Sequence, residues 1–189
     1  MIETFLEYDT KLFLFLNNLG NPAWDNFWLI VTDKLTFIPL YVVLLYLLYK
    51  KYGLKSLLVF VIVVALMITF TDQITNVFKR GFERPRPCGN TDIIDQLRFI
   101  AVRCGKYGFF SGHSSNTMAV AVFTGLMLRP YFKNLIFILL FWSATVAYSR
   151  VYVGVHYPLD IVCGMTFGAI SGFLFYKLTQ YLLRRFVKV

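Results

Sequence analysis

Five long apolar runs, separated by short charged connections, constrain this chain more than any other feature. The runs occupy residues 35–49, 56–78, 107–128, 134–149 and 161–176. An α-helix needs about 20 apolar residues to cross the hydrocarbon core of a bilayer, and most of these runs approach that length. Hydrophobic residues make up 58% of the chain and charged residues 15%, which is more apolar surface than a water-soluble core can bury. The sequence therefore predicts an all-α, polytopic membrane helical bundle with about five transmembrane helices.

One or two further helices are expected ahead of the first run, lying in the membrane interface. Within residues 4–19, apolar side chains recur every three or four residues, which is the spacing of an amphipathic interfacial helix. These side chains are Phe5, Tyr8, Leu12, Phe15, Leu16 and Leu19. Asn21 and Pro22 then provide an N-cap and a first-turn residue, so a second short helix is predicted to begin there.

The acidic residues, and not the basic ones, divide unevenly between the two ends of such a bundle. With five spans, one side carries nine Lys and Arg residues and no acid, whereas the other carries ten basic residues and all ten acidic ones. The total count does not decide the orientation, but the short, purely basic segments 50–55 and 129–133 favour the inner side. We expect an outer N-terminus in a plasma or inner membrane, and we do not interpret the net charge of +9 as a nucleic-acid surface. A single domain, 1–189, is expected in three parts: interfacial helices in 1–34, a transmembrane core in 35–182 and an outer loop in 79–110.

Three sets of polar residues fall on the same outer side, because an even number of spans separates them. Their members are Lys79 and Arg86, then Ser111, Gly112 and His113, then Arg150, His156 and Asp160. Ionisable groups at the end of a membrane span are costly and by default indicate a functional site. The sequence therefore predicts one site assembled from three separate connections.

Each set has a chemical use toward a phosphate group. Lys79, Arg86 and Arg150 can neutralise a phosphate dianion, and a helix that begins near Ser111 and Gly112 would expose unpaired N–H groups to it. His156 and Asp160 are four residues apart, so on a helix they share one face. Asp160 can then hold one imidazole nitrogen and leave the other free to attack phosphorus. His113 is placed to give a proton to a leaving oxygen.

Each feature taken alone also has a structural explanation. The His–Asp pair can be a simple contact, Lys79 and Arg86 can anchor head groups, Ser111 can be an N-cap and Gly112 a tight turn. Both histidines, a helix start and a basic cluster on one membrane face favour a reaction site over these explanations. A protein that only binds or transports anionic lipid remains the non-enzyme alternative, and it would not require two histidines.

The order of these motifs resembles the three-part signature of the type 2 phosphatidic acid phosphatases. The matching pattern is Lys79-x6-Arg86-Pro87, Ser111-Gly112-His113, and Ser149-Arg150-x5-His156-x3-Asp160. One difference is Phe110, where the family usually has a proline before the serine. Three motifs in this order are specific, although any one of them would be weak.

The resemblance implies metal-independent hydrolysis of a lipid phosphate or diphosphate through a phosphohistidine. It makes His156 the nucleophile, Asp160 its orienting partner and His113 the general acid. The phosphate ligands would be Lys79, Arg86, Ser111, Gly112 and Arg150, with no cofactor and no vanadate. Undecaprenyl diphosphate is the expected substrate, and phosphatidylglycerophosphate and lipid A phosphates are the alternatives. The membrane lipid substrate and the bilayer are the expected partners, and no oligomeric state is implied.

Two features outside the motifs, a cysteine pair and an aspartate, each have two possible interpretations. Cys88 and Cys104 lie in the outer loop, where they can form a disulfide or remain two free thiols, while Cys163 is interpreted as a small core residue. Asp72 precedes Lys79 by two helical turns, so it either holds a site lysine or arginine or makes a polar contact between helices.

Overall fold

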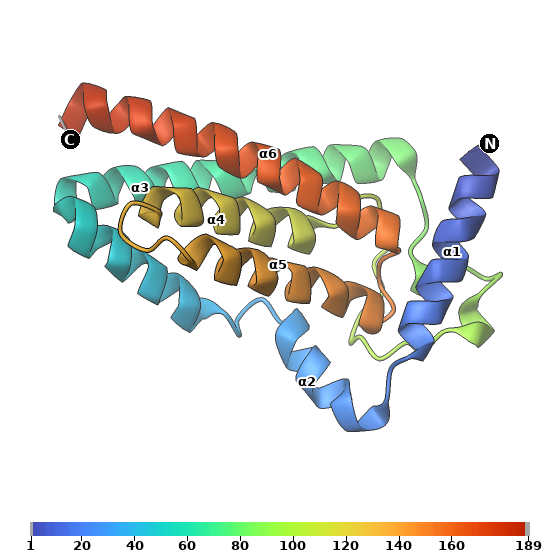
Figure 1. Cartoon of the computed structure of the whole chain (residues 1–189). Helices are drawn as coiled ribbons and strands as arrows, with labels where there is room; N and C mark the ends of the chain where they lie inside the picture. The colour runs from blue at the N-terminus through green and yellow to red at the C-terminus, as the bar shows by residue number, and fades with distance from the viewer. Residues whose placement is uncertain (1, 188–189) are drawn as a thin grey trace.

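Helices account for all the regular structure in residues 2–187, the part of the chain that the computed structural model describes. The α-helices are α1 (Ile2–Asn18), α2 (Pro22–Thr32), α3 (Ile38–Phe82), α4 (Gly112–Leu128), α5 (Leu135–Tyr152) and α6 (Pro158–Leu182) (Figure 1). Short 3-10 turns cover Pro87–Gly89 and Ile94–Gln96, and a π-helical turn, Leu183–Val187, extends α6. The all-α prediction is confirmed.

The long α3 is a pair of arms and not one straight rod. Gly53 has φ 79° and ψ 175°, a conformation outside the helical region, and the ribbon turns sharply at that end of the bundle (Figure 1). Glycine adopts positive φ without the penalty that a Cβ would impose. The two runs at 35–49 and 56–78 are therefore the two arms of α3, and Lys50 and Lys51 do not end the first arm as expected.

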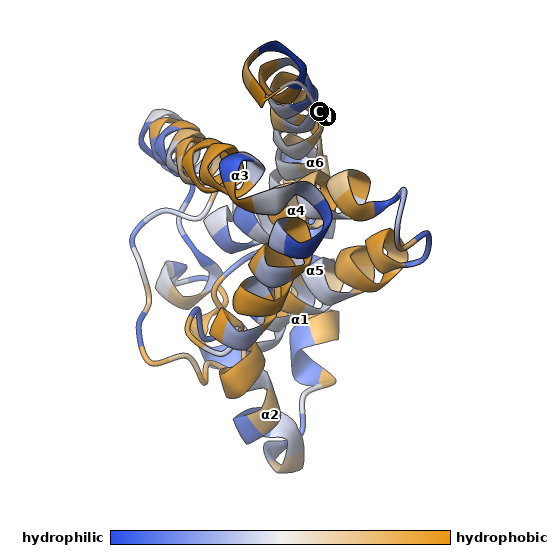
Figure 2. Ribbon diagram, turned by 90° about the vertical axis from the view of Figure 1, so that its left-hand side faces the viewer, coloured by the Kyte–Doolittle hydropathy of each residue, from blue (hydrophilic) through white to orange (hydrophobic). Residues whose placement is uncertain are grey.

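Five helical arms run between the two ends of the bundle: the arms of α3 together with α4, α5 and α6 (Figure 1). Among the described residues, α3, α5 and α6 with its π-helical extension are long and apolar enough to cross a membrane. Large apolar side chains such as Phe141, 77% exposed, and Phe137, 68% exposed, face outward, and hydrophobic colour follows most of α3 and α5 in Figure 2. Such an exposed apolar surface is stable in lipid. The chain is a multi-pass membrane protein.

Helix α4 is the centre of the bundle, and α6 packs on it through glycines. Most of α4 is buried, and a Cβ built on Gly168 of α6 would lie 2.2 Å from the carbonyl oxygen of Ser115. The same close approach recurs four residues away in both directions, at Gly164 beside Ser111 and at Gly172 beside Ala119. Small residues four apart let membrane helices approach backbone to backbone. The apolar run at 107–128 is helical only from Gly112, because residues 107–111 form the connection into α4.

The two N-terminal helices dock against the end of the bundle that lies away from the C-terminus (Figure 1). Asn17 of α1 is buried and donates to the carbonyl oxygens of Val151 (3.0 Å) and Tyr152 (2.9 Å) at the end of α5. The predicted start of α2 is confirmed, since the Asn21 side chain accepts from the Ala23 N–H (2.9 Å). Both helices are therefore attached to the bundle through polar contacts.

The outer connection between α3 and α4 folds over the same end. Cys88 and Cys104 form a disulfide, so the disulfide alternative is confirmed, and Cys163 is the one free thiol among the described residues. Pro85 and Tyr107 pair across the connection in an isolated bridge. These links hold the segment that follows Lys79 against the segment that leads into Ser111.

Candidate functional site

Hydrogen bonds and close contacts join the three predicted motifs at this end of the bundle. The Ser111 N–H donates to the backbone carbonyl of Asp160 (3.0 Å), which connects the second motif to the third. A Cβ on Gly112 would lie 3.8 Å from Lys79 Nζ, so the ammonium group sits beside the first turn of α4. A Cβ on Gly108 would lie 2.9 Å from Asp160 Oδ2 and 3.3 Å from Arg86 Cγ. The structure therefore brings all three motifs together.

His156 and Asp160 form a buried pair, but they do not lie on one helix as expected. His156 is in the loop before α6, whereas Asp160 is the third residue of that helix. The pair still meets, because Asp160 Oδ2 turns back to His156 Nδ1 (3.1 Å) and accepts from the Tyr157 N–H (3.1 Å). A carboxylate at Nδ1 favours the tautomer that has a proton there and a lone pair on Nε2.

The electrostatic surroundings keep His156 neutral. Burial, followed by the charges of Arg86 and Arg150, lowers the pKa of His156 well below its usual value of 6.5. Burial acts in this direction because it penalises the charged imidazolium, and nearby cations repel the same added proton. The uncharged ring is the form that can act as a nucleophile.

Three cationic side chains surround this pair without an acidic partner within 4.0 Å among the described residues; they are Lys79, Arg86 and Arg150. Arg86 Nε donates to the Tyr107 carbonyl (3.0 Å), which fixes its guanidinium in the loop. Arg150 donates from Nη1 to the Thr32 hydroxyl of α2, and its buried Nε has no hydrogen-bond partner in the part of the chain described. Such unpaired donors are suited to an anion.

Ser111, Gly112 and His113 form the start of α4. Ser111 is the N-cap, and its hydroxyl oxygen accepts from the Ser114 N–H (3.4 Å) and hydroxyl (3.0 Å). This capping role was one of the alternatives for Ser111, and it is compatible with an anion at the same helix N-terminus. His113 is partly buried in the first turn, on the helix end that faces the cationic side chains.

Arg84 and Asp9 belong to the same network, although the sequence did not point to them. Arg84 Nη2 pairs with Asp9 Oδ2 (2.6 Å), and Arg84 Nη1 pairs with Asp160 Oδ1 (2.9 Å). The one available sequence signal is that Asp9, Phe13 and Asn17 recur every four residues, which places two polar side chains on one face of α1 with Phe13 between them. All three are buried, so this face is the one that contacts the bundle.

Asp72 makes the interhelical contact and not the ion pair with a site cation. Its Oδ1 accepts from Asn116 Nδ2 (2.8 Å), and the amide oxygen of Asn116 accepts from the Thr71 hydroxyl (2.6 Å). No lysine or arginine lies within 4.0 Å of its carboxylate among residues 2–187. Asp72 therefore connects α3 to α4 close to the first turn of α4, since a Cβ on Gly112 would lie 3.8 Å from its Oδ1.

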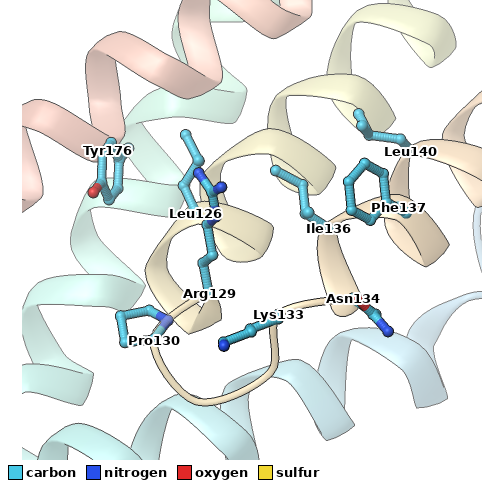
Figure 3. Close-up of a pocket in the computed structure, with 9 residues that line it drawn as sticks. All are labelled: Leu126, Arg129, Pro130, Lys133, Asn134, Ile136, Phe137, Leu140 and Tyr176. Carbon is cyan, nitrogen blue, oxygen red and sulfur yellow. The ribbon is translucent and has the colours of Figure 1, made fainter.

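A separate cavity of about 690 Å³ lies at the opposite end of the bundle and contains none of the predicted site residues (Figure 3). The turn between α4 and α5 forms one side of it, and Tyr176 of α6 lies across from this turn. The pair of histidines and the cationic cluster lie at the other end, so this cavity is not part of the candidate site.

The sequence and the structure both match known proteins. The family model described as the PAP2 superfamily matches residues 56–184. The lipid A 4'-phosphatase of Bacteroides thetaiotaomicron is 37% identical over 188 residues, which are 98% of this chain and 83% of that protein. The lipid A 4'-phosphatase of Porphyromonas gingivalis is 36% identical over 190 residues, 98% of this chain and 79% of that protein.

Solved structures share the fold at low sequence identity. The PAP2-type phosphatidylglycerolphosphate phosphatase of Bacillus subtilis superposes with a TM-score of 0.75 at 21% identity, covering 97% of this chain and 89% of that one. The family match covers well over half of the chain, and the relatives extend it to nearly the full length. This chain belongs to the PAP2 superfamily, as a multi-pass membrane phosphatase.

Proposed function

We propose that this phosphatase hydrolyses a phosphate monoester of lipid A and releases inorganic phosphate. Two relatives that match 98% of the chain carry the name lipid A 4'-phosphatase, which favours this substrate over the undecaprenyl diphosphate expected from the motifs. The observation that carries the chemistry is the buried His156, whose Nδ1 is held by Asp160 (3.1 Å) beside three cationic side chains that have no acidic partner among the described residues.

In the proposed reaction, Nε2 of His156 attacks phosphorus while the bond from phosphorus to the lipid oxygen breaks. His113 gives its proton to that leaving oxygen, so the lipid departs as a free hydroxyl. Water then attacks the phosphohistidine and gives a proton to His113, which releases inorganic phosphate and restores both imidazoles. Asp160 stabilises the positive charge that His156 carries in the intermediate.

Cationic side chains supply the electrostatic part of this mechanism. Lys79, Arg86 and Arg150 would bind the phosphate oxygens, and the first turn of α4 at Ser111 and Gly112 would add N–H donors. Fixed donors of this kind stabilise a transferring phosphoryl group as metal ions do in other enzymes. We therefore propose that no metal and no cofactor is required.

The proposed setting is one domain with its site in the outer leaflet of an inner or plasma membrane. The purely basic segments at the opposite end of the bundle favour placing that end inside. In this orientation the loop 79–110, the disulfide and the two N-terminal helices all lie outside.

The test is a phosphate-release assay of the purified protein against four lipids: lipid A, phosphatidylglycerophosphate, phosphatidic acid and undecaprenyl diphosphate. We expect the largest kcat/KM for lipid A and the same rate with and without EDTA. A preference for undecaprenyl diphosphate would overturn the substrate proposal, and loss of activity with EDTA would overturn the metal-free mechanism.

A further inference from the structure

The carboxylate of Asp9 connects α1 to two parts of the site at once. Its Oδ1 accepts from the Leu159 N–H (2.8 Å) in the first turn of α6, and its Oδ2 accepts from Arg84 (2.6 Å). The Asp9 side chain is only 5% exposed. A buried charge with both oxygens bound is held in one orientation.

Arg84 connects Asp9 to Asp160. Its second nitrogen, Nη1, donates to Asp160 Oδ1 (2.9 Å), and its guanidinium lies over the Tyr157 ring at 4.1 Å. The other oxygen of Asp160 is the one that meets His156 and the Tyr157 N–H. Arg84 therefore binds the half of the Asp160 carboxylate that His156 does not use.

We propose that Asp9 and Arg84 are positioning residues, through which the N-terminal helix α1 fixes Asp160 and hence the nucleophile His156. This inference rests on the roles proposed above for the histidine and its aspartate. It goes beyond them because it assigns a catalytic contribution to a helix that lies outside the five spans and carries none of the three motifs.

The shared guanidinium gives this arrangement an electrostatic consequence. Arg84 divides its charge between two carboxylates, so Asp160 keeps negative charge for His156. With Asp9 neutralised, Arg84 would pair with Asp160 alone and weaken the bond from Asp160 to the imidazole. Transfer of phosphate to His156 would slow, whereas binding of the substrate phosphate, which uses other cations, would change little.

The experiment is a double-mutant cycle between Asp9→Asn and Arg84→Gln, read as kcat and KM for the lipid that the wild type hydrolyses best. We expect Asp9→Asn to lower kcat about tenfold with little change in KM, as loss of an outer hydrogen-bond partner commonly does. The kcat of the double variant should equal that of Arg84→Gln alone, because both substitutions disrupt the same chain of contacts to Asp160. Arg84→Lys, which keeps the charge, should recover part of the loss.

Glu7→Gln is the matched control, since Glu7 lies on the same helix in an exposed pair with Lys11 (2.6 Å). Its kcat should stay at the wild-type value. An unchanged kcat in Asp9→Asn, or additive effects in the double variant, would overturn the positioning role. If Asp9→Asn does not fold, Asp9→Glu provides the comparison, with the same criterion. An inactive wild type or an active His156→Ala would instead indicate failure of the proposed function.

A second inference, carried by different residues, concerns the cavity of about 690 Å³ at the other end. Its wall combines apolar side chains, among them Ile136, Phe137 and Leu140, with the basic side chains of Arg129 and Lys133 (Figure 3). Neither basic group has an acidic partner within 4.0 Å among residues 2–187. The sequence offers none nearby, because the part of this end that the structure describes has eight Lys and Arg residues and no acid.

We infer that this cavity binds an anionic phospholipid of the adjacent leaflet. The head-group phosphate would pair with Arg129 and Lys133, and an acyl chain would lie along Phe137 and Leu140. Basic pockets between transmembrane helices are suited to such head groups. The inference is independent of which lipid the site hydrolyses.

Native mass spectrometry with phosphatidylglycerol, phosphatidylcholine and free glycerol phosphate tests this site. We expect phosphatidylglycerol alone to be retained, and the double variant Arg129→Gln with Lys133→Gln to weaken its retention about 30-fold, from about 1 kcal/mol for each of the two basic residues. Lys55→Gln, at the same end but outside the cavity, should retain the lipid normally. Equal retention by the double variant and the wild type, or equal retention of phosphatidylcholine, would overturn the site.

Discussion

The two ends of the bundle differ in whether their basic side chains have acidic partners. At the site end, acidic and basic side chains pair with one another, as in the largely buried Asp9–Arg84–Asp160 network and the partly exposed Arg98–Asp25 pair. At the other end, basic residues occur without any acid, and neutral contacts such as the Tyr52 hydroxyl to the Met127 carbonyl (2.6 Å) hold the arms together.

This difference shows where unpaired positive charge is stable. A partly buried charge without an acidic partner is suited to a ligand of opposite charge, so the three partly buried cations around His156 indicate a place for a bound anion. At the other end the cations lie at the membrane surface, where water and lipid phosphates satisfy them. Surplus positive charge alone therefore does not identify the site. The site is identified by positive charge that is partly buried beside paired acidic side chains.

Removing the proposed nucleophile is the strongest test of this contrast. We expect His156→Ala to lower kcat by about 10⁴-fold or more, because no other side chain can take the phosphoryl group in its place. Phosphate release measures the loss, and size-exclusion chromatography checks the fold. Release at a wild-type rate would show that the buried pair is only structural.

The next largest effect is expected from equal charge changes at the two ends. Arg150→Gln should lower kcat/KM by about 10²- to 10³-fold, the usual cost of losing a donor to the transition state. Lys55→Gln removes one positive charge at the other end and should leave kcat/KM unchanged. Steady-state kinetics of the two variants compares them directly, and equal losses would contradict a local role for Arg150.

Substitutions at two glycines on one face of α6 test the effects of packing and of catalysis separately. A Cβ on Gly164 would lie 2.6 Å from the Ser111 carbonyl oxygen, and one on Gly172 would lie 2.5 Å from that of Ala119. Gly164→Ala and Gly172→Ala should lower Tm by similar amounts, since the steric conflict is similar. Only Gly164→Ala should also lower kcat, because it displaces the N-cap of α4. Thermal unfolding together with kinetics tests the pair, and equal effects on kcat would contradict this division.

The smallest effect is expected far from the site. Tyr52→Phe removes the hydrogen bond to Met127 and should destabilise the protein by about 1 kcal/mol or less, with kcat unchanged. Thermal unfolding measures the first effect and phosphate release the second. A large fall in kcat would mean that the two ends are coupled through α4.

The sequence by itself predicted the helical membrane bundle, its apolar runs and the meeting of the three motifs at one end. These follow from local properties: the length of apolar runs, the residues at helix starts such as Asn21 and Pro22, and the even number of spans between Lys79, Ser111 and Arg150. The pairing of Cys88 with Cys104 could be anticipated for the same reason, since both lie in one connection.

Only the tertiary structure decided which side chains meet. Arg84 is 76 residues from Asp160, and Asp9 is 150 residues from Leu159, so no periodicity links them. Asp72 contacts Asn116 and not Lys79 for the same reason, and His156 reaches Asp160 from a loop and not from a shared helix. Spacing along the chain limits which residues can share a face, whereas the packing of α1, α3 and α6 around α4 selects their partners.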